Sequence, residues 1–175
     1  MVEEIEIRES IPSDAALLEK LYRGAFPDED LLPTVRELLS EKTIVLSLVG
    51  IADGDLVGHV IFTTCGIAEG TDKVSLLGPL AVAPVWQGHG IGGALVREGL
   101  RRLENAGAIQ VYVLGDPAYY GRFGFEPEVG VTPPYPLPAE WRGAWQSIRL
   151  SRVGRPPHGR LSVPHPWLRP VLWAP

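Results

Sequence analysis

The stretch from Leu77 to Leu95 constrains this chain most, because an apolar run, a glycine cluster and a helical pattern follow one another within it. The run, rich in Leu and Val, predicts a buried strand, and Pro84 ends it because proline cannot donate to a sheet ladder. The glycines of 88–93 lead into a helical pattern that extends to Asn105. Such an order gathers free backbone N–H groups and the positive end of a helix dipole at one point. The stretch therefore predicts a phosphate cradle.

The charges around this loop agree with an anionic ligand. No Asp or Glu occurs between Asp72 and Glu98, and Arg97 and Arg101 follow on the predicted helix. The letters Gly88-x-Gly90-x-x-Gly93 match the dinucleotide-binding fingerprint. That fingerprint belongs to a repeating βαβ domain, and the residues before it show no such alternation. The loop also lacks the Gly-Lys-Ser/Thr ending of a nucleoside triphosphate loop, so by itself it leaves open which phosphate compound it binds.

Length and composition indicate a soluble globular chain, most simply one domain over residues 1–175. Hydrophobic residues make up 45% and charged residues 21%, and no apolar run approaches the roughly 20 residues of a membrane helix. The acidic N-terminus has no secretory segment, and the single cysteine, Cys65, excludes an internal disulfide. A net charge of −5 argues against general nucleic-acid binding. We expect a cytoplasmic monomer or homodimer with no membrane or nucleic-acid partner.

The residues before the loop alternate between strand and helix patterns. Ser13-Asp14 is a plausible cap for a helix, and the acidic residues 28–30 are expected to begin a second one. Asp53-Gly54 predicts a tight turn between strands 43–52 and 56–66. His59 lies in the second of these strands, where a structural or surface role is the simpler interpretation. Cys65, near its end, is expected to be a small buried hydrophobe.

The residues after the loop continue the pattern. Gly107 is expected to cap the helix that the glycine loop begins, and 109–114 predicts a strand parallel to the central one. Gly115-Asp116-Pro117 then predicts the start of a short helix. Within the central strand, 74–83, the pair Gly78-Pro79 predicts a bulge or a freed edge. A freed edge would leave backbone groups available to a ligand.

Two motifs carry a family resemblance. Gln87-x-x-Gly90-x-Gly92 resembles the acyl-CoA pyrophosphate loop of the GNAT N-acetyltransferase superfamily, Gln/Arg-x-x-Gly-x-Gly/Ala. Tyr120 stands four residues before Gly124-Phe125, which is similar to the Tyr-x-x-x-Gly-Phe of the same enzymes. The resemblance covers about residues 5 to 128, and 115–120 looks like the YhbS-like predicted acetyltransferases. One departure is Asp116, which replaces the usual asparagine near the end of the fifth strand.

The resemblance implies an α/β (α+β) fold, with a GNAT-type mixed sheet of about seven strands flanked by about four helices. Strands four and five of that sheet are splayed apart. Eleven of the 17 prolines lie from Pro127 onward, and six arginines but no acidic residue follow Glu140. We expect residues 129–175 to close the sheet, with strands at 146–150 and 160–163, and to pack as a tail.

The resemblance also implies a reaction, the transfer of an acetyl group from acetyl-CoA to a primary amine by direct attack, without a metal. Tyr120 is the expected general acid for the leaving thiolate. The general base stays open among Asp116, His59 and a water chain, and an amine bound already neutral needs none. The expected cofactor-binding residues are Leu80, Ala81, Val82, Gln87, Gly88, His89, Gly90, Ile91, Gly92 and Gly93.

Other functions are compatible with the same residues. The domain could bind acyl-CoA without turnover, as a regulatory or interaction module whose basic, Trp-rich tail holds a partner. A nucleotide-binding oxidoreductase is the weaker alternative, since only the fingerprint letters favour it. The acceptor, a small-molecule or peptide amine, is not specified by the sequence, and neither is the length of the acyl group.

Overall fold

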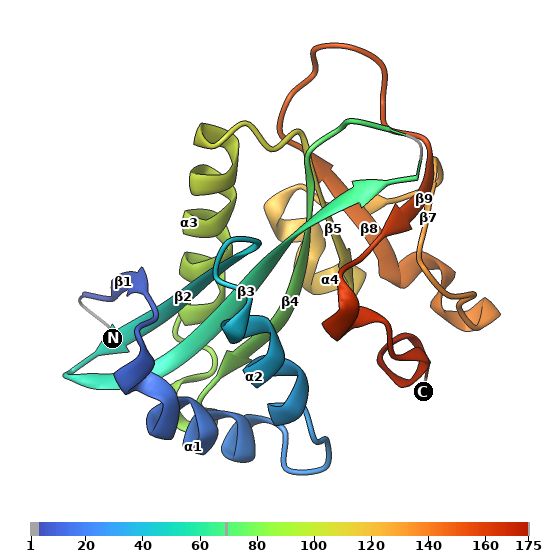
Figure 1. Cartoon of the computed structure of the whole chain (residues 1–175). Coiled ribbons are helices and arrows are strands. Elements are labelled where there is room, and N and C mark those ends of the chain that lie inside the picture. The colour runs from blue at the N-terminus through green and yellow to red at the C-terminus, as the bar shows by residue number, and fades with distance from the viewer. Residues whose placement is uncertain (1–3, 69, 175) are drawn as a thin grey trace. The chain divides into compact units, whose positions relative to one another are not determined.

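The structure, a computed structural model, describes residues 4–68 and 70–174 (Figure 1). Its helices are α1 (Ala15–Ala25), α2 (Leu32–Ser40), α3 (Ile91–Asn105) and α4 (Pro117–Tyr120). Its strands are β1 (Glu6–Glu9), β2 (Val45–Ala52), β3 (Asp55–Ile67), β4 (Val74–Val82), β5 (Gln110–Leu114), β6 (Glu126–Pro127), β7 (Val131–Thr132), β8 (Trp145–Arg149) and β9 (Gly159–Ser162). Paired strands follow the order β1-β2-β3-β4-β5-β8-β6, with β7 and β9 off this path. The expected mixed α/β sheet, with β4 parallel to β5, is confirmed.

Residue contacts divide the chain into two compact units, and each combines two separate stretches of sequence. The first unit comprises residues 1–62 and 78–101, and the second comprises 63–77 and 102–175. The boundary passes through β3 after Phe62 and through β4 after Leu77. The expectation of one domain over 1–175, closed by 129–175, stays a prediction.

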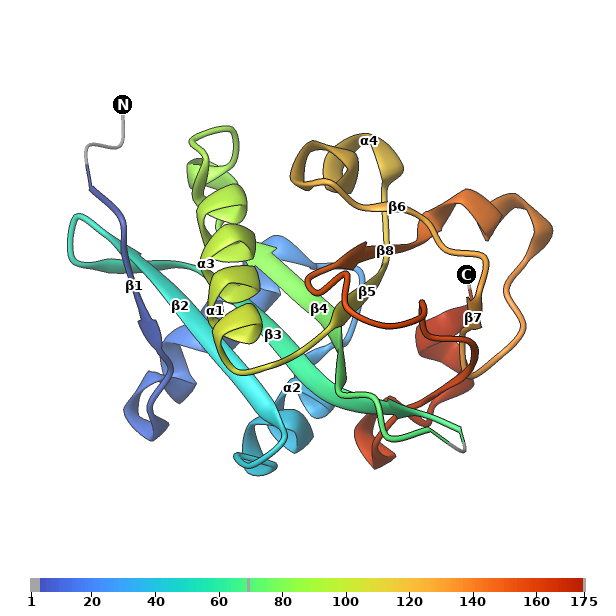
Figure 2. The same cartoon turned by 90° about the horizontal axis from the view of Figure 1, so that it is seen from above.

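The first unit is built on the β2–β3 hairpin. Asp53 and Gly54 have φ angles of 52° and 80°, the two positive values that a type I′ turn requires, so the predicted tight turn is confirmed. β1 pairs antiparallel with β2, from Glu6↔Ile51 to Glu9↔Leu48. α1 and α2 cover one face of this hairpin and α3 covers the other (Figures 1 and 2).

Glycines allow α3 to lie close against the hairpin. A Cβ at Gly58 of β3 would lie 2.8 Å from Ile91 Cγ2 and 2.9 Å from Leu95 Cδ1. A Cβ at Gly99 of α3 would lie only 2.0 Å from Phe62 Cε2. Real Cβ atoms are not found at such distances, so these positions require glycine for the observed helix-to-sheet separation.

The opposite face of β3 carries a buried polar chain. Because side chains alternate along a strand, His59 faces α1 where its neighbour Gly58 faces α3. The imidazole Nδ1 lies 2.7 Å from Tyr22 Oη, and Nε2 lies 2.7 Å from Ser47 Oγ. Ser10 Oγ in turn donates to Ser47 Oγ at 2.6 Å. Burial lowers the pKa of His59 to about 3, so the ring is neutral at physiological pH.

Asp14 occupies the N-cap position of α1, as expected, but its side chain makes no cap hydrogen bond to that helix. Its carboxylate accepts instead from Arg8 (2.8 and 2.9 Å) and from Ile11 N–H (2.8 Å). The hydrogen bond with Arg8 holds the pKa of Asp14 below its usual value. The acidic residues 28–30 do not begin a helix, since α2 starts at Leu32 with Pro33 in its first turn.

The second unit is organised around β5. β4 runs parallel to it from Val74↔Gln110 to Leu77↔Val113, and β8 pairs antiparallel on its other side. The expected strand at 146–150 is β8, shifted by one residue. The expected strand at 160–163 is β9, shifted by one residue. It pairs with the end of β3 and with β7, and β6 takes the place beside β8.

The core of this second unit is aromatic. Tyr112 stacks on Trp145 with 5.5 Å between ring centroids, and Trp173 meets Trp145 edge-on at 5.9 Å. The tail tryptophan Trp173 is therefore a packing anchor. Cys65 is buried in the same cluster, and burial raises the pKa of its thiol to about 12, as expected for a small buried hydrophobe.

We predict that Gly99→Ala destabilises the protein. Alanine favours a helix over glycine by about 1 kcal/mol, but the new methyl group would overlap the Phe62 ring. Overpacking of this kind costs about 1–3 kcal/mol, so a net loss of stability is expected in urea unfolding. Gly121→Ala is the control, because a Cβ there meets nothing within 4 Å. If Gly99→Ala is as stable as wild type, the packing described is contradicted. The same holds if adding Phe62→Leu to Gly99→Ala does not recover part of the lost stability.

We also predict that His59 makes stability depend on pH. Its folded pKa of about 3 lies below the unfolded value near 6.5, so in that window the unfolded chain binds a proton that the folded chain does not. The free energy of unfolding should therefore fall by about 1.4 kcal/mol per pH unit as pH drops from 6.5 toward 3. Urea unfolding between pH 7 and 5 measures this slope. His59→Gln should reduce the slope by the amount that corresponds to the uptake of one proton on unfolding. An equal slope in both proteins would refute the assignment.

Candidate active site

The glycine loop lies in the first unit, between β4 and α3. A short 3-10 turn, Pro84–Trp86, leads into Gly88 and Gly90, whose φ angles are 79° and 82°. A Cβ at either glycine would meet nothing within 4 Å, so the turn is open and the glycines serve the backbone conformation. The first hydrogen bond of α3 runs from Ala94 N–H to Gly90 O at 3.0 Å. The amides of residues 91–93 therefore have no acceptor within the helix, as in an anion site.

Two polar side chains brace this loop from within. Gln87 Nε2 donates to Val82 O at 3.1 Å, which ties the loop to the end of β4. His89 Nδ1 lies 3.1 Å from Trp86 O and 3.0 Å from Gln87 O. Because both partners are carbonyl oxygens, Nδ1 must carry the ring proton. His89 thus stabilises the loop by binding two of its carbonyl groups, and its ring also makes an edge contact with the Trp86 ring.

The end of β4 supplies the strand positions that were expected to bind the cofactor. The register with β5 ends at Leu77, and Gly78 and then Pro79, which has no N–H to donate, come next. Leu80, Ala81 and Val82 lie beyond that register, in the first unit. Beyond them, Ala83 N–H donates to Val57 O at 2.8 Å, which anchors the strand end on β3. A ligand role for these three positions stays a prediction.

Tyr120 lies in the second unit, at the end of α4. Asp116 caps this helix, because its Oδ1 accepts from Ala118 N–H at 2.9 Å. The Tyr120 ring meets Tyr119 at 5.1 Å and Phe125 at 5.7 Å between centroids. A Cβ on Gly115 would lie 2.5 Å from Tyr120 Cε2, so glycine is needed there for the ring to pack. Burial raises the pKa of Tyr120 above its ordinary value, and the phenol keeps its proton at neutral pH.

The expected residues thus fall into two groups. The cofactor set, Leu80 to Val82 and Gln87 to Gly93, lies together in the first unit, and Tyr120 lies in the second. Of the candidate bases, His59 has both ring nitrogens hydrogen-bonded in the interior, which excludes it from surface proton transfer. Asp116 is occupied with its cap. Gly115 was not predicted as a residue that positions Tyr120, although a glycine directly before a helix cap is visible in the sequence.

Within the described residues, 4–68 and 70–174, neither a metal-binding cluster nor a membrane-spanning helix is found. No group of three or more His, Cys, Asp or Glu side chains in this part of the chain is arranged to hold a metal ion. No helix there has the length and apolar character needed to cross a bilayer.

Comparisons with known proteins agree with both motifs. Residues 15–125 match the model of the acetyltransferase (GNAT) family. An uncharacterised N-acetyltransferase of Escherichia coli, YjhQ, is 36% identical over 79% of this chain and 81% of its own length. The crystal structure of E. coli YhbS in complex with CoA superposes with a TM-score of 0.84 at 30% identity, covering 94% of this chain and 92% of YhbS. A GNAT acetyltransferase of Brucella melitensis, solved with acetyl-CoA, gives 0.76 at 31% identity, covering 94% and 98%.

Membership of this family favours an acyl-CoA-dependent enzyme over the nucleotide-binding oxidoreductase that the fingerprint letters suggested. The expected enzyme class, an acyltransferase, is confirmed at the level of the family. Because the family model matches more than half of this chain, the chain belongs to the acetyltransferase (GNAT) family.

Proposed function

We propose that this protein transfers an acetyl group from acetyl-CoA to a primary amine. The observation that supports this most is the open glycine turn at the start of α3. The turn offers the amides of 91–93 without an intrahelical acceptor, and no side chain fills the space above Gly88 and Gly90. In a chain of this family, such a cradle suits the diphosphate of CoA.

The residues present fit that ligand electrostatically. No Asp or Glu occurs from Lys73 to Arg97, so the loop itself carries no carboxylate to repel a diphosphate. Gln87 and His89 use their side chains to hold the backbone, which keeps the amides of the loop in place for binding. Preorganised amides of this kind bind an anion without a further cost of ordering the loop.

The remaining roles belong to β4 and Tyr120. Acetyl-CoA, when bound, supplies a thioester whose acetyl group passes to the amine and whose CoA part leaves as a thiol. The main chain at Leu80–Val82 would bind the pantetheine arm and donate a hydrogen bond to the carbonyl oxygen on which negative charge develops. Tyr120, protonated at neutral pH, would donate its proton to the departing sulfur. The amine would attack in its neutral form, and the proton that its nitrogen loses on becoming an amide would pass through water to the Tyr120 phenolate, with no dedicated base.

We predict that Gly90→Leu abolishes acetyl-CoA binding. The added side chain occupies the open space above the turn and blocks the approach of a diphosphate to the amides. In wild type, acetyl-CoA at 100 times its dissociation constant should stabilise the fold by about 2.7 kcal/mol, which thermal unfolding detects. The variant should show no such shift.

Gly54→Leu is the matched control for this variant. Gly54 has a φ of 80°, against 82° at Gly90, and a Cβ there also meets nothing within 4 Å. Both variants should lose stability through the same left-handed strain, about 1–2 kcal/mol, but Gly54→Leu should still respond to acetyl-CoA. A full response of Gly90→Leu would remove the loop from cofactor binding.

We predict that Tyr120→Phe lowers the rate of acetyl transfer on the order of 10²-fold, because the phenolic proton is lost. The assay follows release of free thiol across a panel of small-molecule and peptide amines. Acetyl-CoA binding should be unchanged, since the ring still packs in the same place. Tyr119→Phe, the neighbouring ring, is the control and should retain the wild-type rate.

The same assay separates turnover from binding alone. Undiminished turnover in Tyr120→Phe would exclude the tyrosine from the chemistry while sparing the cofactor site. If acetyl-CoA stabilises the wild-type protein but no amine is acetylated, the alternative of a non-catalytic acyl-CoA-binding module gains support.

A further inference from the structure

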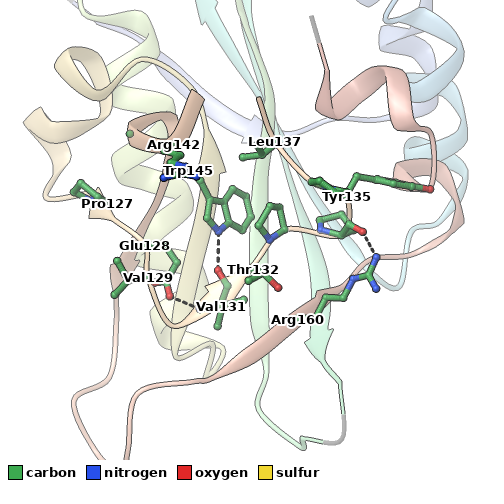
Figure 3. Close-up of a pocket in the computed structure, with 14 residues that line it drawn as sticks. Pro127, Glu128, Val129, Val131, Thr132, Tyr135, Leu137, Arg142, Trp145 and Arg160 are labelled. Atoms are coloured by element: carbon green, nitrogen blue, oxygen red, sulfur yellow. Dashed lines mark hydrogen bonds between the residues drawn. The ribbon is translucent and has the colours of Figure 1, made fainter. Parts of the chain in front are cut away.

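The second unit contains a pocket whose lining includes none of the residues proposed for cofactor binding or catalysis. It has a volume of about 800 Å³ and lies between the segment 127–145 and Arg160 (Figure 3). A volume of this order is typical of sites for small molecules. Val129, which lines it, is 94% exposed, so the pocket reaches the surface with an apolar residue uncovered.

The walls of this pocket are rings held in fixed positions. Four prolines line it, and proline rings have little conformational freedom to lose when a ligand binds. Trp145 contributes its indole, whose Nε1–H donates to Val131 O at 2.8 Å (Figure 3). That bond uses the only polar atom of the indole, and Trp145 is only 3% exposed, so it lines the pocket as part of the core and offers a ligand little surface of its own. Tyr135 and Leu137 complete a lining suited to a flat, apolar body.

The acidic side chain of the pocket is occupied within the protein. Glu128 Oε1 accepts from Gln110 Nε2 at 3.1 Å and from Ser147 Oγ at 2.6 Å. Its Oε2 accepts from the amides of Gly130 and Val131 at 2.7 and 2.6 Å. Four donors thus engage this carboxylate, which serves to fold the 128–131 turn. It is not left to bind a cationic ligand.

The basic side chains of the pocket, in contrast, keep donors available. Arg160 donates to Pro134 O through one terminal nitrogen, and a guanidinium carries five N–H donors in all. Arg142, an exposed residue, has no hydrogen-bond or ion-pair partner within the described part of the chain. A guanidinium binds a carboxylate through two parallel hydrogen bonds. The pocket therefore combines apolar rings with unused donors for an anion.

We propose that this pocket binds a small carboxylate with an apolar ring, an arylalkyl carboxylic acid. The ring would pack against the prolines and Tyr135, and the carboxylate would pair with the guanidinium of Arg142 or Arg160. The inference goes beyond the acetyl transfer proposed above and does not rest on it. It concerns binding alone, so it is tested without acetyl-CoA.

The probe is 3-phenylpropionate, titrated into the full chain and followed by ligand-detected NMR. Two analogues with the same ring and chain length, 3-phenylpropan-1-ol and 3-phenylpropylamine, test the need for the negative charge. We expect saturable binding of the carboxylate with a dissociation constant of about 1 mM or tighter, a modest efficiency for so small a ligand. The alcohol should bind at least about 10-fold more weakly than the carboxylate, and the amine should not bind at all.

Variants locate the site. Arg142→Gln and Arg160→Gln should each weaken binding of 3-phenylpropionate, with about a 10-fold loss for at least one of them. Arg152→Gln removes an exposed arginine of the same unit outside the pocket and should change nothing. Because Arg142 is exposed, its replacement leaves the fold intact, which thermal unfolding verifies. Absence of saturable binding, equal binding of the alcohol, or an equal effect of Arg152→Gln would overturn the proposal.

Discussion

The close contact between α3 and the β2–β3 hairpin is the constraint on which the first unit depends. Glycines at 58 and 99 remove the side chains that would otherwise hold the helix away from the strands. Ile91 and Leu95 pack into the space at Gly58, so the first turn of α3 is fixed directly beside the sheet. The free amides of that turn are therefore positioned by packing as well as by the loop that precedes them. A phosphate cradle needs such rigidity, because an anion is bound by amides whose directions are set in advance.

Much of the fold and of the candidate site followed from the sequence where the signal is local. The hairpin turn at Asp53-Gly54, the helix after the glycine loop and the cap at Gly107 each depend on a backbone conformation that few residues adopt, and all three are found. The two motifs were recognisable because each combines particular residues at a fixed spacing, Gln87 with Gly90 and Gly92 in one and Tyr120 with Gly124-Phe125 in the other. The cap role of Asp14 was predicted correctly in position but not in its hydrogen bonds. Its cap pattern is local, but its carboxylate is taken by Arg8, across a turn that the pattern does not report.

Long-range pairing was the part that the sequence could not provide. A strand was expected at 160–163, but its partners were not predicted: β9 pairs with residues 66 and 67 and with β7. Its apolar alternation is the same for either partner, so the pattern contained no information on which edge it would join. The environment of His59 was hidden for a similar reason. Tyr22 and Ser47 are far from it in sequence, and only the packed structure makes one strand histidine the centre of a buried polar chain.

The division of β3 and β4 between two compact units has a consequence for how this chain can vary. Each unit is assembled from two stretches, and the stretches of one are interrupted by those of the other. Neither unit corresponds to a continuous piece of polypeptide, so neither can be deleted, duplicated or exchanged by a single insertion or excision. A change at Phe62–Thr63 or Leu77–Gly78 acts on a strand that both units share. The glycine loop and the helix that carries Tyr120 therefore cannot be exchanged independently, because two continuous strands run through both units, whatever contacts their side chains make.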